Sequence, residues 1–98
     1  SREGILVIGI CDDDKSWVQT CKNTLMKFAA FINIDMEIKC FYTSKELLDY
    51  QDIPLDAVFL DIELGRQNGI MIAKKLNRIR PNCRIIYDEL FTLCDRNL

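Results

Sequence analysis

Two short apolar runs, each ending in aspartate, constrain the fold of this chain more than any other feature of its sequence. One run covers residues 58–60 and leads into Asp61, and the other covers residues 5–11 and leads into the three aspartates at 12–14. An uninterrupted apolar run of this kind predicts a strand that is buried on both faces of a parallel sheet. Ligands bind at the carboxyl ends of the strands in such sheets. We therefore expect Asp61 in a crevice and not in the core.

A strand-end aspartate such as Asp61 also has a simpler explanation, because Asp side chains cap turns. The pair Asp12 and Asp13 weighs against it, since adjacent carboxylates repel each other unless they are exposed or neutralised by a cation. Mg²⁺ takes oxygen ligands, usually one or two carboxylates with waters and phosphate. Asp12, Asp13 and Asp61 are thus candidate Mg²⁺ ligands, provided that their strands are neighbours. Asp14 or Ser16 is expected to cap the following helix.

Composition limits the classes of protein to which the chain can belong. Its 98 residues, 49% of them hydrophobic, suit one domain over residues 1–98 with an ordinary core. The net charge is −2 and the basic residues are scattered, which argues against nucleic-acid binding. No apolar segment is long enough to span a membrane, and no signal-peptide pattern opens the chain.

Histidine and cysteine usage narrows the chemistry further. The absence of His excludes a Ser-His or Cys-His nucleophile. The cysteines are odd in number and far apart, and most lie in apolar patterns. This predicts reduced core thiols of a cytoplasmic protein, and it argues against a disulfide framework or a zinc site. The five are Cys11, Cys21, Cys40, Cys83 and Cys94.

Hydrophobic periodicity predicts alternating strands and helices up to residue 87. The predicted strands cover residues 5–11, 36–42, 56–61 and 83–87, and the predicted helices cover about 16–32, a short segment after the N-cap Thr43, and 69–80. The apolar faces of the long helices are expected to be buried; they comprise Val18, Cys21, Leu25, Phe28, Ala29 and Ile32, and Ile72, Ala73, Leu76 and Ile79. Gly9 inside the first strand suggests close packing at that position, for example of a helix against the sheet.

The order of these elements predicts the architecture. Short links and right-handed crossovers give an α/β three-layer sandwich, in which helices cover both faces of a parallel sheet. In the flavodoxin-like strand order 2-1-3-4(-5), the first and third strands are adjacent at the switch point. Asp12, Asp13 and Asp61 should then converge, and the strand at 36–42 should lie at the sheet edge.

The two acidic motifs together resemble the receiver domain of bacterial two-component response regulators, and they are most similar to the LytTR-type subgroup. The motifs are Ile10-Cys-Asp-Asp-Asp-Lys15 and Val58-Phe-Leu-Asp-Ile-Glu-Leu-Gly-Arg-Gln-Asn-Gly69. The resemblance covers about residues 4 to 87. It includes the acid pair, the strand-end aspartate and a glycine eight residues after it.

The resemblance implies a role for each acid. Asp61 would accept a phosphoryl group from a sensor histidine kinase. Asp13 would bind Mg²⁺ directly and Asp12 mostly through water, while the backbone carbonyl of Glu63 would complete the protein ligands. The domain would be a cytoplasmic signalling module and not an enzyme. Phosphorylation would switch an output domain in a longer parent chain, a DNA-binding transcription regulator in the LytTR-type subgroup, and would favour a homodimer. The domain itself would bind neither membrane nor nucleic acid.

The chain departs from the receiver pattern after Tyr87. A receiver has a Ser or Thr there that binds a phosphoryl oxygen, and later a fifth strand ending in Lys. This chain continues with Asp88-Glu89, and residues 88–98 predict one amphipathic helix. The C-terminal part is therefore expected to be incomplete, either because a stretch between Tyr87 and Asp88 is missing from the sequence or because the domain is truncated.

Three alternatives to a phosphorylated receiver follow from the residues. The first is a degenerate receiver that binds a partner without being phosphorylated; the departures after Tyr87 add weight to it, although the phosphorylated receiver remains the leading interpretation. A haloacid-dehalogenase-like enzyme also uses a strand-end Asp, but it needs a second Asp two residues later, where this chain has Glu63. A flavodoxin-like flavin protein needs a Ser/Thr/Gly-rich phosphate loop after the first strand, where this chain has acids.

Overall fold

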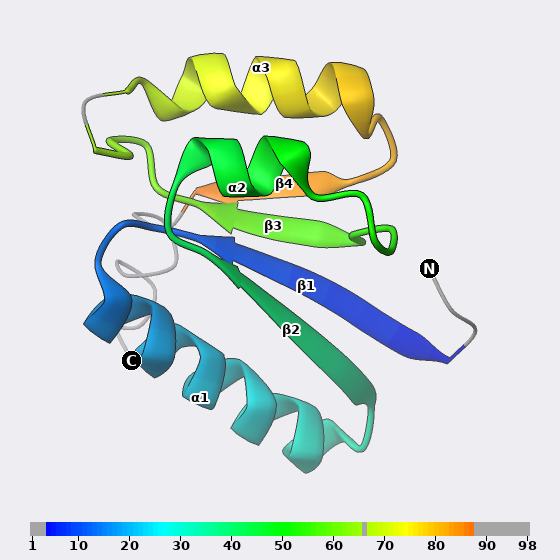
Figure 1. Cartoon of the computed structure of the whole chain (residues 1–98). Helices are drawn as coiled ribbons and strands as arrows, with labels where there is room; N and C mark the ends of the chain where they lie inside the picture. The colour runs from blue at the N-terminus through cyan, green and yellow to red at the C-terminus, as the bar shows by residue number, and fades with distance from the viewer. Residues whose placement is uncertain (1–3, 66, 88–98) are drawn as a thin grey trace.

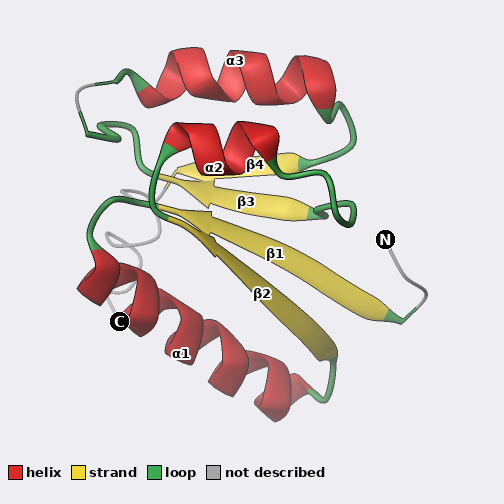
Figure 2. Ribbon diagram, in the orientation of Figure 1, coloured by secondary structure: helices red, strands yellow, loops and turns green. Residues whose placement is uncertain are grey.

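The computed structural model describes residues 4–65 and 67–87, which form a parallel four-stranded sheet with helices on both faces (Figure 1). The strands are β1 (Ile5–Cys11), β2 (Asp35–Phe41), β3 (Ala57–Leu60) and β4 (Arg84–Tyr87). The helices are α1 (Lys15–Ile32), α2 (Ser44–Asp49) and α3 (Gly69–Ile79), and strands and helices alternate along the chain (Figure 2). None of the described helices is both long and apolar enough to traverse a bilayer.

The order of the strands in the sheet is β2-β1-β3-β4, which confirms the predicted flavodoxin-like topology. Figure 1 shows α1 on one face of the sheet and α2 and α3 on the other, so the described part has three layers. In the register, Cys11 pairs with Phe41 of β2 and with Leu60 of β3. The carboxyl ends of these three strands are therefore level with one another.

The core confirms that β1 and β3 are buried on both faces. All four residues of β3 are buried, as are the last five of β1, whereas β2 at the edge is half-buried along most of its length. On the face toward α2 and α3, the core includes Val7, Cys11, Val58, Leu60, Leu47, Ile72 and Leu76. On the face toward α1, it includes Ile8, Ile10, Ala57, Phe59, Val18 and Cys21.

Side-chain acceptors cap α1 and α2. Asp14 is the one of the two predicted candidates, Asp14 and Ser16, that caps α1, and Thr43 caps α2 as predicted. The carboxylate of Asp14 accepts from the backbone N–H of Trp17 at 3.0 Å, and the Thr43 hydroxyl accepts from the N–H of Glu46 at 3.1 Å. The carboxylate of Glu46 bonds back to the N–H of Tyr42, one residue before the N-cap. These contacts fix where α1 and α2 leave the carboxyl edge of the sheet.

Parts of the predicted apolar helix faces are exposed, which corrects that expectation. Phe28 is 55% exposed, Ile32 43% and Ile79 56%. Helical periodicity identifies an apolar face, but it does not tell how much of that face the sheet covers. Among the described elements, α1 packs mainly on β1 and β2, and Ile79 is the last residue of α3.

The close packing expected at Gly9 is confirmed, but its partner is not a helix. A Cβ atom at Gly9 would lie 3.2 Å from Cγ2 of Val58 and 3.3 Å from Cε2 of Phe41. Both neighbours belong to the adjacent strands β3 and β2. Gly9 therefore makes room for side chains of the sheet itself, and not for a packed helix.

Two further predictions lie outside the described residues. They are the amphipathic helix over residues 88–98 and the missing stretch between Tyr87 and Asp88. Both stay predictions.

Candidate functional site

The three candidate acids lie at the carboxyl ends of β1 and β3, which the sheet topology makes neighbours. The N–H of Asp61 donates to the carbonyl of Cys11 at 3.1 Å, and the N–H of Asp12 donates to the carbonyl of Phe41 at 3.0 Å. These bonds extend the pairing of β1 with β3 and with β2 past the strand ends. The backbone therefore holds Asp12 and Asp61 side by side, although they are far apart in sequence.

The carboxylates of Asp12, Asp13 and Asp61 form an acidic cluster. One oxygen from each residue lies within 4.8 Å of the others. Asp12 is buried, Asp61 is half-buried and Asp13 is exposed, so the cluster extends from the core to the surface. The structure thus brings together all three aspartates that the sequence singles out. Asp61 lies at the strand end and is half-buried, whereas Asp12 is buried at the edge of the core.

Local hydrogen bonds orient two of these carboxylates. Oδ1 of Asp12 accepts from the N–H of Asp14 at 2.9 Å, and Oδ1 of Asp61 accepts from the N–H of Glu63 at 3.1 Å. Both are bonds from a side chain to the backbone two residues later, which Asp makes readily. Each carboxylate is therefore held against the loop that follows its own strand.

The donor set of the cluster fits a hard divalent cation. Carboxylate oxygens are the ligands that Mg²⁺ prefers, and two ligands at about 2.0–2.1 Å from one ion are no more than about 4.2 Å apart. Separations of up to 4.8 Å need only a small side-chain rotation, or a water molecule between one carboxylate and the ion. A bound cation would also offset the repulsion among the three negative charges.

Two glycines shape the loop over residues 61–68, which joins β3 to α3. A Cβ atom at Gly69 would lie 2.3 Å from the carbonyl oxygen of Asp61, so the helix starts in direct contact with the strand end. Gly65 has φ +60°, a conformation that strongly favours glycine, and its Cβ position would be 3.9 Å from Oδ2 of Asp13. Glu63 lies in the same loop with its side chain exposed.

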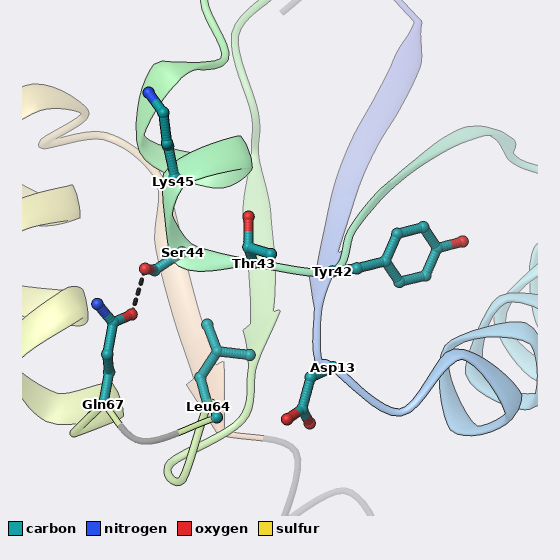
Figure 3. Close-up of a pocket in the computed structure, with 8 residues that line it drawn as sticks. Asp13, Tyr42, Thr43, Ser44, Lys45, Leu64 and Gln67 are labelled. Atoms are coloured by element: carbon teal, nitrogen blue, oxygen red, sulfur yellow. Dashed lines mark hydrogen bonds between the residues drawn. The ribbon is translucent and has the colours of Figure 1, made fainter.

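A cavity of about 350 Å³ adjoins Asp13 between this loop and the start of α2 (Figure 3). Its lining includes three residues that the sequence analysis did not identify: Ser44, Lys45 and Gln67. The sequence could have indicated them, because they follow β2 and β3, and these two strands end at the same edge of the sheet. Lys45 is exposed, and its hydrogen bond to Asp49, at 2.6 Å, raises its pKa.

The sequence comparisons identify no relative. The chain matches no protein-family model. It also matches no curated protein.

Solved structures do resemble it, and they are receiver domains of response regulators. The BeF3-activated DrrB receiver domain superposes with a TM-score of 0.68 at 23% identity, over 85% of this chain and 64% of the other. A response regulator from Burkholderia pseudomallei gives 0.71 at 17% identity, over 84% and 45%. A CheY-like receiver domain protein from Methanospirillum hungatei JF-1 gives 0.66 at 25% identity, over 85% and 62%.

These similarities define the class of fold. Topology and superposition agree on the CheY-like, flavodoxin-type arrangement of a parallel sheet with strand order 2-1-3-4. The chain spans less than two thirds of the length of each of these three proteins. At 17–25% identity, the comparisons establish the shared fold, and the function of this chain has to be argued from its site.

Proposed function

We propose that this chain, over residues 1–98, is a phosphoacceptor receiver domain in which Asp61 takes a phosphoryl group from a sensor histidine kinase. One observation carries the proposal: Asp12, Asp13 and Asp61 converge at the carboxyl edge of the sheet, with their oxygens within 4.8 Å. This is the edge at which α/β sheets bind ligands. A half-buried acid at the end of a buried strand, beside two further acids, suits Mg²⁺-dependent phosphoryl transfer.

The residues divide the work of that reaction. A carboxylate oxygen of Asp61 attacks phosphorus, a P–O bond forms, and the P–N bond to the donor histidine breaks. Asp13, Asp12 and the backbone carbonyl of Glu63 are the proposed Mg²⁺ ligands, with Asp61 as a further one. Bound Mg²⁺ supplies positive charge that offsets the repulsion between the carboxylate and the phosphoryl group. The hydrogen bond from the Glu63 N–H orients the Asp61 carboxylate at the strand end.

Two structural neighbours support this proposal by the chemistry of their own sites. The Burkholderia pseudomallei response regulator carries a phosphorylated aspartic acid and a calcium ion. The DrrB receiver domain is activated by BeF3. These chemistries belong to those proteins. We propose the acidic cluster of this chain as the site of the same chemistry, because it lies at the carboxyl edge of the same kind of sheet.

The setting of the domain follows from the same proposal. The domain would act as a cytoplasmic signalling module rather than as an enzyme. Phosphorylation would act on an output domain in a longer parent chain, with homodimerisation as one means. The similarity of the motifs to the LytTR-type subgroup supports a DNA-binding, transcription-regulating output domain.

A degenerate receiver that binds its partner without phosphorylation is the second candidate. The observation in its favour is Asp88-Glu89 directly after Tyr87, where the resemblance implies a hydroxyl side chain for a phosphoryl oxygen. If fewer side chains bind the phosphoryl oxygens, phosphoryl transfer should be slow. The acceptor should still be Asp61, because no other acid shares its position.

Phosphorylation with acetyl phosphate and Mg²⁺ tests the proposal. Intact-protein mass spectrometry should show one added phosphoryl group in the wild type and none in Asp61→Asn. Asp52→Asn, which changes an exposed aspartate in the loop before β3, is the matched control and should be labelled like the wild type. Equal labelling of wild type and Asp61→Asn, or labelling in the presence of EDTA, would contradict Asp61 as the Mg²⁺-dependent acceptor. No labelling of the wild type would favour the degenerate receiver.

A further inference from the structure

Ser44 and Gln67 join two segments that flank the acidic cluster. Ser44 is the first residue of α2, and Gln67 lies near the end of the loop over residues 61–68. The Ser44 hydroxyl donates a hydrogen bond to the side-chain carbonyl of Gln67 (Figure 3). Both residues line the cavity beside Asp13. We call this contact the Ser44–Gln67 bond.

The loop is well anchored at its base and in its middle. The N–H of Asp61 bonds to Cys11 at the start, and the N–H of Gly69 bonds to the carbonyl of Ile62 at 2.5 Å at the end. Leu64 is 3% exposed and belongs to the core. Gln67 is held by two hydrogen bonds. Its N–H donates to the carbonyl of Leu64 within the loop, and its side chain accepts from Ser44 of α2.

The α2 side of the bond is the fixed partner. The Thr43 hydroxyl caps the helix by accepting from the N–H of Glu46, and Leu47 in the same turn is fully buried. Gly65 of this loop lies beside Asp13, because the Cβ position of Gly65 is 3.9 Å from Oδ2 of Asp13. A displacement of Gly65 therefore changes the surroundings of Asp13, and it also moves Glu63, two residues earlier in the loop.

We propose that Ser44 and Gln67 are positioning residues, whose hydrogen bond holds the loop over residues 61–68 in the conformation that binds the divalent cation. This inference rests on the proposed function, because it concerns the same site. Without the bond, the loop samples more conformations in the free protein. Ordering it on cation binding then costs free energy, which lowers the affinity.

Mn²⁺ binding, followed by isothermal titration calorimetry, tests the proposal. Loss of one neutral hydrogen bond should weaken Mn²⁺ binding about two- to fivefold in Ser44→Ala and equally in Gln67→Ala. The double variant should be no weaker than either single variant, because both remove the same contact. Ser44→Thr keeps the hydroxyl and should restore wild-type affinity.

A matched control separates this role from general stability. Gln19→Ala removes an exposed side-chain hydrogen bond of the same kind, from Gln19 Nε2 to Asn23 Oδ1 at 3.0 Å, but on α1. It should leave Mn²⁺ affinity unchanged, and all variants should keep the wild-type melting temperature within a few degrees. In EDTA, the amide protons of Gln67 and Glu63 should exchange faster in Ser44→Ala than in Gln19→Ala.

The outcomes distinguish this inference from the proposed function. If the wild type binds Mn²⁺ and Asp13→Asn does not, but Ser44→Ala binds and exchanges like the wild type, the positioning role is wrong and the receiver function stands. If the losses of Mn²⁺ affinity in the two single variants add up in the double variant, the two residues do not act through one shared contact, and the positioning role is wrong. If the wild type itself binds no Mn²⁺, the proposed function is wrong, and the positioning role is wrong with it.

Discussion

Asp13 is the most solvent-exposed of the three carboxylates in the acidic cluster. Without a cation, the oxygens of Asp12, Asp13 and Asp61 repel one another within 4.8 Å. Asp13→Asn removes one of the three charges and keeps the shape of the side chain. We expect it to raise the melting temperature in EDTA by a few degrees, as measured by circular dichroism, while it weakens Mg²⁺ binding.

Asp52→Asn is the control at the residue scale, because it removes one negative charge from an exposed position away from the carboxyl edge of the sheet. Its melting temperature in EDTA should stay close to that of the wild type. A strong destabilisation by Asp13→Asn in EDTA would mean that Asp13 has a structural role. That result would weaken its assignment as a cation ligand.

The central strand β3 is the element on which the position of Asp61 depends. Phe59 is 8% exposed and packs on the α1 face of the sheet with Ile8 and Ala57. Truncation to alanine leaves a cavity, so Phe59→Ala should lower the free energy of unfolding by about 3–5 kcal/mol. Urea denaturation followed by circular dichroism measures this change.

Phe31→Ala is the matched control at the scale of elements. Phe31 lies in α1 and is 88% exposed, so the same truncation should change the free energy of unfolding by less than about 0.5 kcal/mol. Similar losses in the two variants would contradict the burial described for β3. They would imply that a further contact covers Phe31 in solution.

At the scale of the whole molecule, cation binding and folding are linked, because the acids meet only in the folded chain. A ligand at about 100 times its Kd stabilises the folded state by about 2.7 kcal/mol. For a domain of this size, that raises the melting temperature by about 10–20 °C. We expect Mg²⁺ to produce such a shift in differential scanning calorimetry, and NaCl at equal ionic strength to produce much less.

Asp13→Asn provides the internal test of this linkage. The Mg²⁺-dependent shift should shrink in this variant, although its melting temperature in EDTA is expected to be higher than that of the wild type. If Mg²⁺ raises the melting temperature equally in both proteins, the stabilising cation binds outside the acidic cluster.

The sequence by itself determined the order of the elements, the strand topology and the three aspartates at the switch point. Strands buried on both faces leave near-continuous apolar runs, and short links between strands and helices permit few topologies. Together with the flavodoxin-like strand order, in which the first and third strands are adjacent, these constraints placed Asp12, Asp13 and Asp61 together. The sequence pattern alone, however, could not identify what packs against Gly9, which lies against side chains of both neighbouring strands.

Only the tertiary structure decided which apolar faces are covered and which polar side chains meet. Phe28 and Ile79 follow the helical period, but their burial depends on how far the sheet extends beneath each helix. Ser44 and Gln67 are 23 residues apart and carry no motif. They meet because the loops after β2 and β3 leave the same edge of the sheet. Periodicity is a local property of the chain, whereas coverage and loop contacts depend on how distant segments are placed in space.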